Sequence, residues 1–340
     1  MRLSICIPTY NRSHHLANCL ESVRVSRDRA GCDVEVCVSD NASTDATEAI
    51  VRAMQERMPI VYHRNPKNLG IPRNFLNVVE MASGEFAWLL GDDDLLMAHS
   101  LAEICALIEG HAGVDFFYVN SFHLDTEYVL SFPQPFNTAN LPDAMMPFSS
   151  WRGEGELPFL RLIDPKVSWD FLGGMFLSVF RRSKWLEHAG ALSASALADS
   201  RTFSEFDNTF PHVKIFARAF SDSRAYFHPK PLSVCLTGAR EWAPMYPFVR
   251  SVRLVEALDE FRRNGLSLLR YLRCRNFALR TLMPDLANMT LNKDISGYRY
   301  AHPVKVFMRN VLYPNSLLSV PYYFFRKLSF RFLRPKRGTR

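Results

Sequence analysis

Residues 84–94 read GEFAWLLGDDD, and this stretch decides the fold. Residues 86–90 are apolar without interruption, as expected of a buried strand in a parallel sheet. The run passes through a glycine into three adjacent carboxylates, Asp92, Asp93 and Asp94. Adjacent carboxylates repel one another, and a hard cation such as Mg²⁺ or Mn²⁺ relieves that repulsion. The stretch therefore predicts a buried strand that ends in a metal site, with a solvated acidic turn before the next helix as the alternative.

Strand and helix patterns alternate on both sides of this stretch. Short apolar or alternating runs predict strands at residues 2–8, 34–38, 60–62, 86–90 and 115–119. Apolar residues at helical spacing predict helices at residues 14–25, from a Ser43-Thr44 cap to residue 58, at 70–82 and at 98–110. This order predicts an α/β fold with a doubly wound, mostly parallel sheet flanked by helices. Ligands of such sheets bind at the carboxyl ends of the strands.

The second half of the chain is less regular. Residues 124–150 are rich in Pro, Asn and Ser and predict a long loop. Further patterns predict a strand at 173–181, a helix at 204–219, one or two short strands at 225–236, and only helices from about 247. We therefore expect an α/β domain over residues 1–240 and a helical, basic region over residues 241–340.

Polar residues follow several of the predicted strands. They are Thr9, Tyr10, Asn11 and Arg12 after the first strand, Asp40 and Asn41 after the second, and the aspartates after the fourth. A carboxylate at Asp40 can accept hydrogen bonds from a ribose or a base edge, although an Asx turn with Asn41 is the simpler explanation for that residue alone. A turn at Asn68-Leu69-Gly70, with Arg73 and Asn74, precedes a helix whose N-terminus can face an anion.

Cysteine usage and the amino-terminal pattern bear on the compartment. The seven cysteines are odd in number and include no CxxC motif, so we expect neither a disulfide framework nor a zinc site, and a reducing compartment is favoured. A strand pattern begins at Leu3, so no signal peptide is expected. No run of roughly 20 uninterrupted apolar residues occurs, so no membrane-spanning helix is expected either.

The carboxyl-terminal tail is strongly basic. Residues 299–340 contain ten Lys and Arg residues, and no acidic residue follows Asp294. These charges exceed the net charge of +7, so the rest of the chain is slightly acidic. Interleaved aromatic residues predict peripheral attachment to an anionic membrane surface, with a packed helix pair and a solvated basic face as the alternative. No nucleic-acid-binding motif accompanies the charge, so no nucleic acid partner is expected.

Four stretches together form a recognisable pattern. They are SICIPTYNR (4–12), VEVCVSDNASTDAT (34–47), NLGIPRNFLNVVEMASGEFAWLLGDDD (68–94) and, more loosely, GGMFLSVFRRSKW (173–185). With these motifs the chain resembles the family 2 glycosyltransferases, which have the GT-A fold. The resemblance covers residues 1 to about 235, and it is most specific in the first hundred residues, where the motifs keep their order and spacing.

The resemblance implies an inverting, metal-dependent transfer of a sugar from a UDP-, dTDP-, GDP- or CDP-sugar to a saccharide or polyprenyl-diphosphate-linked acceptor. It implies bacterial O-antigen, capsule or exopolysaccharide synthesis, in the cytoplasm at the inner face of the plasma membrane. The residues it assigns to donor binding are Pro8, Thr9, Tyr10, Asn11, Asp40, Asn41, Asn68, Gly70, Arg73, Asn74 and Asp92. It makes Asp93 the chief ligand of Mn²⁺ or Mg²⁺, with Asp92 and Asp94 beside it. The family motif usually begins with Asp, and this chain has Gly91 there.

An inverting transferase needs a general base to take the proton of the acceptor hydroxyl. The family commonly provides a Glu-Asp pair at the start of a helix, where this chain has Pro211-His212 within FSEFDNTFPHVKIFARAF (203–220). The candidates are therefore His212, Asp207 and Glu205. Histidine suits the role because its ordinary pKa lies near 6.5, but a packed or helix-capping histidine is the alternative. We expect Trp169, Asp170, Gly173 and Gly174 to shape the acceptor site, although Trp169 is equally consistent with a core position.

Two other functions compete with this interpretation. A nucleotidyltransferase would use similar metal and nucleotide chemistry, but it is expected to carry a glycine-rich loop after the first strand, and the residues after Ile7 contain none. A non-catalytic nucleotide-sugar-binding or scaffold protein on the same fold is consistent with the missing Glu-Asp pair.

Overall fold

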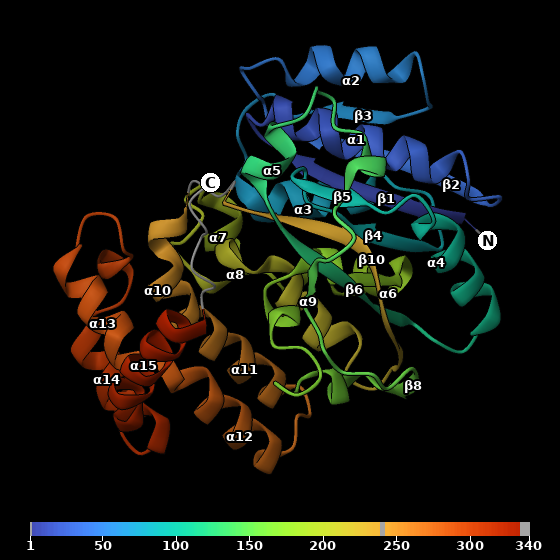
Figure 1. Ribbon diagram of the computed structural model, residues 1–340. Helices are drawn as coiled ribbons and strands as arrows, with labels where there is room; N and C mark the ends of the chain where they lie inside the picture. Colours follow the sequence, from blue (N-terminus) through green and yellow to red (C-terminus); the bar gives the residue numbers. More distant parts are fainter. Residues whose placement is uncertain (1, 239–241, 334–340) are drawn as a thin grey trace. The chain divides into compact units, whose positions relative to one another are not determined.

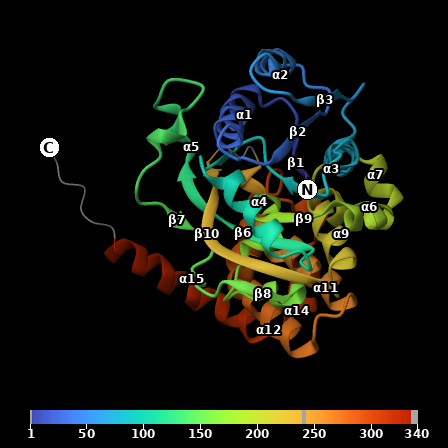
Figure 2. The same cartoon turned by 90° about the vertical axis from the view of Figure 1, so that its right-hand side faces the viewer.

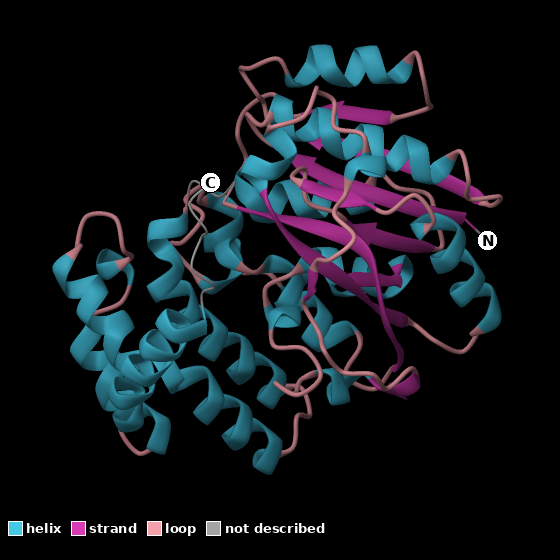
Figure 3. Cartoon of the chain, in the orientation of Figure 1, coloured by secondary structure: helices cyan, strands magenta, loops and turns pink. Residues whose placement is uncertain are grey.

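The computed structural model describes residues 2–238 and 242–333. The chain divides into two compact units (Figure 1). The first comprises Met1–Arg240 with Arg263–Gly265, and the second comprises Glu241–Arg262 with Leu266–Arg340. The first unit contains the sheet, and the described part of the second is helical and irregular (Figure 3).

A mixed sheet forms the centre of the first unit. Its strands are β1 (Arg2–Thr9), β2 (Asp33–Asp40), β3 (Val61–Arg64), β4 (Phe86–Leu89), β5 (Asp94–Leu96), β6 (Phe116–Asp125), β7 (Met146–Pro147), β8 (Gly155–Pro158), β9 (Ser178–Arg181) and β10 (Arg224–Thr237). Their spatial order is β3-β2-β1-β4-β9-β6-β10-β5, with β7 beside β6 and β8 beside β10. Strands β3, β2, β1 and β4 are parallel, and so are β6 and β10, whereas β9 runs antiparallel between β4 and β6. The predicted α/β fold with a mostly parallel sheet is confirmed.

Helices flank this sheet (Figures 1 and 2). They are α1 (Ser13–Arg27), α2 (Thr47–Gln55), α3 (Gly70–Glu80), α4 (Ser100–Gly110), α5 (Thr126–Leu130), α6 (Arg182–His188), α7 (Ala194–Ala198), α8 (Phe206–Thr209) and α9 (Pro211–Ala219). The expected Ser43-Thr44 cap of α2 is wrong, because the helix begins at Thr47 and the Asp45 side chain accepts a hydrogen bond from the Thr47 amide at 3.0 Å.

Three local expectations need correction. Strand β5 was missed, because its three residues acquire strand character only by pairing with Ser233–Cys235 of β10. The strand expected at 173–181 is confined to β9, and residues before it form short 3₁₀ turns. The helix expected at 204–219 is two helices, because Pro211 has no amide hydrogen and starts a new helix at its first position.

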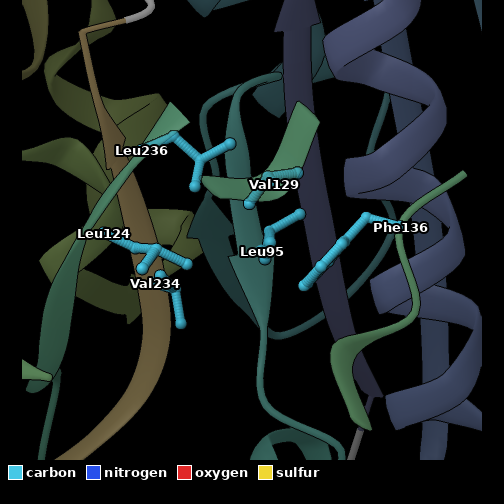
Figure 4. Close-up of a cluster of buried hydrophobic side chains, with 6 residues drawn as sticks. All are labelled: Leu95, Leu124, Val129, Phe136, Val234 and Leu236. Atoms are coloured by element: carbon cyan, nitrogen blue, oxygen red, sulfur yellow. The ribbon is translucent and has the colours of Figure 1, made fainter. Parts of the chain in front are cut away.

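The core of the first unit lies on both faces of the sheet. Around Phe116, in β6, the rings of Phe159, Phe171, Phe216 and Phe220 pack edge-on with centroids 4.9–5.6 Å away. A separate apolar cluster forms beneath the segment expected to be a loop. Its members are Leu95, Leu124, Val129, Phe136, Val234 and Leu236 (Figure 4). This cluster explains why much of the 124–150 segment is fixed although, after the end of β6, it contains only the short helix α5, one 3₁₀ turn and the short strand β7.

Cysteines differ from expectation at one pair. Cys32 and Cys105 form a disulfide, with Cα atoms 6.7 Å apart and a sequence separation of 73. The other five cysteines are buried and take part in no disulfide. The odd number and the missing CxxC motif did not reveal this pair, because a single bridge between distant segments leaves no spacing signal in a sequence.

The second unit is built of helices. They are α10 (Tyr246–Phe248), the greater part of α11 (Leu254–Arg263), α12 (Leu268–Ala278), α13 (Leu282–Leu291), α14 (Pro303–Asn310) and α15 (Pro314–Leu333). Buried Asp285 of α13 joins three segments: its carboxylate pairs with Arg250 and accepts hydrogen bonds from the hydroxyls of Ser251 and Thr281. Within the described residues, no helix is both long and apolar enough to cross a bilayer.

Replacing Gly70, the first residue of α3, is expected to destabilise the first unit. Its backbone is left-handed, with φ +82°, and a Cβ there would lie 3.0 Å from the Cα of Ser200. We expect Gly70→Ala to lower the free energy of unfolding by about 1–2 kcal/mol, measured by urea denaturation. Gly110→Ala is the control, because that Cβ meets open space and should leave stability unchanged or slightly higher. Equal losses in both variants would contradict the strain argument.

Candidate functional site

Two carboxylates and a guanidinium meet where β1 and β4 end. The Thr9 hydroxyl donates a hydrogen bond to Asp92 at 2.8 Å. The Nη1 atom of Arg12 lies 3.1 Å from an oxygen of Asp92 and 3.1 Å from an oxygen of Asp93. Because β1 and β4 are parallel neighbours, residues 80 positions apart in sequence arrive at one sheet edge. The arrangement therefore collects the first and third polar clusters of the sequence in one place.

The pKa of Asp92 reflects these surroundings. It is raised from the ordinary 3.8 to about 7, chiefly by burial and in part by the neighbouring charge of Asp93, while Arg12 and the Thr9 hydroxyl oppose the shift. Perturbed carboxylates of this kind cluster at functional sites.

Asp94 lies apart from this pair. Its carboxylate is buried and accepts a hydrogen bond from the Gly91 amide at 2.9 Å, and its backbone pairs with Cys235 in the sheet. Of the three carboxylates expected to act together, Asp92 and Asp93 therefore share Arg12, and Asp94 has a different partner. A Cβ at position 91 would lie 2.6 Å from Asp94 Oδ2 and 2.9 Å from Asp93 Oδ1, so a larger residue there would displace these carboxylates.

A network of asparagine side chains ties β1, β2 and α3 together. Asn74 donates to the Ser39 carbonyl at 3.0 Å and accepts from the Ser39 hydroxyl at 2.7 Å. Asn41 donates to Asn68 at 2.9 Å and accepts from the Leu69 amide at 2.9 Å. Each amide both donates and accepts, so the side chains fix the turn before α3 relative to the ends of the strands.

Two members of this network, Asn65 and Asn77, were missed by the sequence argument. Asn65 is buried and donates to Asn41 and Asn74, both at 3.2 Å, and Asn77 donates to Asn65 at 3.0 Å. Their only sequence signal was an unusual density of asparagine between residues 65 and 77.

Asp40 is fully buried and already satisfied. One oxygen accepts from the Ser43 amide and the other from the Tyr62 hydroxyl, each at 2.8 Å. That bonding is the Asx-type turn foreseen as the simpler explanation. Asn11, with φ +53°, likewise braces the same loop, because its side-chain oxygen accepts from the Thr44 amide at 2.7 Å.

Other expected donor residues differ in exposure. Pro8 and Gly70 are buried, whereas Asn68, Arg73 and Tyr10 reach the surface, with the Tyr10 ring 41% exposed. The side-chain oxygen Oδ1 of Asn68 accepts a hydrogen bond from the Gly70 amide at 2.8 Å, which holds the turn at the start of α3. Exposed Tyr10 is thus an aromatic face available to a planar ligand at the end of β1.

The residues expected to shape an acceptor site form one turn. The Asp170 carbonyl accepts from the amides of Gly173 and Gly174 at 3.0 and 2.8 Å. The turn leads into β9, which is antiparallel to β4, so it enters the sheet at the edge where β4 ends. Trp169 is half-buried at the start of this turn, while Asp170 and Gly173 are exposed.

His212 has the environment of a packed side chain. It is 3% exposed, and its ring lies 5.7–6.2 Å from the rings of Phe75, Phe210 and Phe216. Neither ring nitrogen has a hydrogen-bond partner among the described residues. Burial lowers the pKa of His212 to about 3, which makes it a weak proton acceptor at neutral pH. These surroundings do not favour His212 as a base.

The two carboxylate candidates differ from each other. Asp207 is buried, accepts from the Ser193 amide and pairs with Lys214, both at 2.7 Å. Glu205 is half-buried, and its carboxylate accepts hydrogen bonds from the hydroxyls of Ser193 at 3.0 Å and Ser195 at 3.1 Å. Asp207 therefore has a structural ion pair, while Glu205 retains a more accessible carboxylate.

A segment that the sequence argument did not single out lies against the turn before α3. The Asp199 carbonyl and the Ser200 Cα sit 3.1 and 3.0 Å from the place where a Cβ of Gly70 would be. Helices α7 and α8, on either side of this segment, both pack on α3. The segment that leads to Glu205 is thereby held beside the Asn68–Gly70 turn.

The positions of Asp92 and Asp93 bear on whether this edge of the sheet can bind a divalent metal ion. Among residues 2–238 and 242–333, no three His, Cys, Asp or Glu side chains gather into a metal-binding group. Asp92 and Asp93 nevertheless offer carboxylate oxygens, which are hard metal ligands, and both carboxylates contact the guanidinium of Arg12. Mg²⁺ is usually held by one or two carboxylates together with ligand phosphates. The pair fits such a metal, with the remaining ligands supplied by a bound diphosphate and water.

The fold has counterparts among solved structures. The structure of TarS 1–349 from Staphylococcus aureus in complex with UDP aligns with a TM-score of 0.56 and 15% identity, over 100% of this chain and 94% of that chain. The mannosyltransferase PcManGT from Pyrobaculum calidifontis, in complex with GDP-Man and Mn²⁺, aligns with a TM-score of 0.52 and 17% identity, over 98% and 88%. This likeness establishes a GT-A fold.

Sequence comparisons define the family. A family model described as Glycosyl transferase family 2 matches residues 4–148. The chain is 31% identical to abequosyltransferase RfbV of Salmonella typhimurium over 248 residues, which cover 69% of this chain and 66% of the relative. It is 33% identical to a GalNAc(5)-diNAcBac-PP-undecaprenol beta-1,3-glucosyltransferase of Campylobacter jejuni over 117 residues, or 33% and 37%. The alignment spans less than two thirds of either relative.

Thr9, Arg12 and Asp92 lie together at the carboxyl edge of a sheet in a domain that has the GT-A fold. The chain contains a domain of glycosyl transferase family 2 that includes residues 4–148, and the relatives named above are glycosyltransferases.

Replacing His212 tests whether it is a packing residue. We expect His212→Leu to fold and to raise the free energy of unfolding at pH 7 by about 1 kcal/mol, since two unpaired buried nitrogens are removed. The wild type should also lose stability as pH falls from about 6.5 to about 3, because only the unfolded histidine binds a proton in that window. Urea denaturation at several pH values should show a weaker pH dependence in the variant. A destabilised variant with unchanged pH dependence would contradict this assignment.

Proposed function

We propose that this protein is an inverting, metal-dependent glycosyltransferase that moves a sugar from a nucleotide-sugar to a saccharide or polyprenyl-diphosphate-linked acceptor. The observation that supports it most directly is the grouping of Thr9, Arg12, Asp92 and Asp93 at the carboxyl edge of a GT-A sheet. Assembly of a bacterial surface polysaccharide, such as O-antigen, capsule or exopolysaccharide, is the proposed setting. Abequose, the sugar named for the Salmonella relative, is one candidate for the transferred group.

The nucleotide is proposed to bind across the ends of β1 and β2. Tyr10 offers an exposed ring to the base, and the asparagine-braced turn at Asn68 and Gly70 offers polar groups at the start of α3. Asp40 acts mainly by holding the loop after β2, since both its oxygens are bonded within the protein. Because these groups are already fixed by hydrogen bonds, little ordering is needed when the nucleotide binds.

Arg12, Asp92 and Asp93 are proposed to receive the diphosphate. Asp93 would hold a divalent ion, with Asp92 as the second carboxylate, and the ion would neutralise charge on the leaving nucleoside diphosphate. Arg12 compensates the two carboxylates and can also pair with phosphate oxygens, because a guanidinium presents several donors. Asp94 is assigned to the turn and not to the metal, because its carboxylate is bonded to the Gly91 amide.

Glu205 is proposed as the general base. The acceptor hydroxyl oxygen attacks the anomeric carbon as the bond to the diphosphate oxygen breaks, so the configuration inverts and the nucleoside diphosphate leaves. The hydroxyl proton passes to the Glu205 carboxylate. Enclosure of His212 by phenylalanine rings and pairing of Asp207 with Lys214 favour Glu205 over both. The turn at Trp169, Asp170, Gly173 and Gly174 is proposed to contact the acceptor.

A thermal-shift screen of UDP-, dTDP-, GDP- and CDP-sugars, each with and without Mn²⁺, tests the donor site. We expect one nucleotide class to raise the Tm only when the metal is present. Asp93→Asn should abolish this shift and leave the Tm of the free protein unchanged. Asp94→Asn is the contrast, because it should lower the Tm of the free protein without selectively removing the response to Mn²⁺.

Turnover that is unchanged in EDTA would overturn the metal assignment. A metal-dependent shift without any turnover on candidate acceptors would favour a non-catalytic nucleotide-sugar-binding protein.

Base assignment is tested by comparing two isosteric variants. We expect Glu205→Gln to lower kcat by about 10²–10⁴-fold with the donor thermal shift retained, because only proton transfer is removed. Asp207→Asn should instead lower the Tm, since it leaves Lys214 without its buried carboxylate partner. His212→Leu should keep its activity. Full activity of Glu205→Gln would transfer the role to another residue.

A further inference from the structure

Helix α15 buries small polar side chains and exposes large apolar ones. It lies against α13 and the turn Leu279–Thr281. The residues it buries there include Ser316 and Ser319, both fully inaccessible, and the Ser319 hydroxyl accepts a hydrogen bond from the Met283 amide at 3.1 Å. Amphipathic helices of globular proteins ordinarily bury their apolar side and expose their polar side. Along this part of α15 small polar residues take the inward positions.

The large apolar side chains of the same region face outward. Six of them define what we call the α14–α15 face: Val304, Met308, Leu312, Leu317, Leu318 and Phe324, each more than half exposed. In Figure 2 the carboxyl-terminal half of α15 (red) extends beyond the other helices of its unit. Exposed apolar residues are normal when scattered, but six of them within residues 304–324, on consecutive helices and the turn between them, indicate an interaction surface.

Basic residues accompany this face in register. On α14, Val304 and Met308 are four residues apart, and so are Lys305 and Arg309, which are also exposed. Side chains four residues apart lie on the same side of a helix, so an apolar stripe runs beside a basic stripe. No acidic residue occurs after Asp294 to balance the charge. Residues 334–340 and the side chains of residues 326–333 lie outside the described part of the chain.

Charge distinguishes between the possible occupants. A second copy of this chain would bring ten basic residues of its own within residues 299–340, and the two surfaces would repel each other. An anionic bilayer complements the charge and receives the apolar groups at its interface. Spanning is not required, because no described helix is long and apolar enough to cross a bilayer.

We propose that the α14–α15 face is a docking surface for an anionic lipid bilayer, on which α14 and α15 lie in the plane of the interface. The apolar stripe inserts at the boundary between headgroups and acyl chains, and Lys305 and Arg309 contact lipid phosphates. This proposal is independent of the sugar transferred, because lipid binding is measured without donor or acceptor.

The test is sedimentation of the full chain with sucrose-loaded vesicles of phosphatidylcholine alone or with 30% phosphatidylglycerol, a composition chosen as roughly that of a moderately anionic leaflet. We expect binding to the anionic vesicles, weakening as salt is raised, and little binding to the neutral ones. The double variant Leu317→Gln/Leu318→Gln should reduce binding at least about tenfold, because two inserted side chains are lost. Lys305→Gln/Arg309→Gln should reduce binding and its salt dependence.

Matched controls use apolar side chains of similar exposure in the first unit. Leu130→Gln/Met146→Gln replaces two such residues and should leave vesicle binding unchanged. All variants are first checked for an unchanged Tm, since the replaced side chains are exposed. Failure to sediment with anionic vesicles, or equal losses in test and control variants, would overturn the proposal. Concentration-dependent dimerisation that the Leu317→Gln/Leu318→Gln change abolishes, without vesicle binding, would assign the face to a second copy instead.

Discussion

Charge compensation between Arg12 and the pair Asp92 and Asp93 is the constraint on which the site depends. Two adjacent carboxylates at the end of a buried strand are unfavourable unless a cation lies close by, and Arg12 provides one from the end of the neighbouring strand. The same contact fixes the ends of β1 and β4 relative to each other. A metal cation or a phosphate group that binds at this edge therefore meets a guanidinium and two carboxylates that already compensate one another.

Neutral asparagine side chains form a hydrogen-bond network close to Arg12, Asp92 and Asp93. Asn41, Asn65 and Asn74 are buried and exchange hydrogen bonds with each other and with the ends of β1 and β2. Neutral amides add donors and acceptors without changing the net charge of the site. The carboxyl edge can thus be rigid while the electrostatic balance remains with Arg12 and the two aspartates.

The sequence predicted the parts of this molecule that depend on local pattern. Alternating apolar segments identified the α/β fold, and polar residues at strand ends identified Thr9 and Asp92 as neighbours, because parallel strands place their ends together. Features created by distant segments were not predictable in this way. Strand β5 exists through pairing with β10, the Cys32–Cys105 bridge joins separate segments, and His212 is enclosed partly by Phe75, which precedes it by 137 residues. The direction in which Asp94 turns was hidden for the same reason.

Gly91 has a consequence for how the domain can vary. Because Gly91 has no side chain, there is space for the Asp94 carboxylate to accept a hydrogen bond from the Gly91 amide. Asp94 is also a residue of β5, where it pairs with Cys235 of β10. The residue at position 91, just before the three aspartates, is therefore linked through Asp94 to the pairing of β5 with β10. A larger residue at position 91 is therefore expected to displace the Asp94 carboxylate and, through Asp94, to disturb the pairing of β5 with β10.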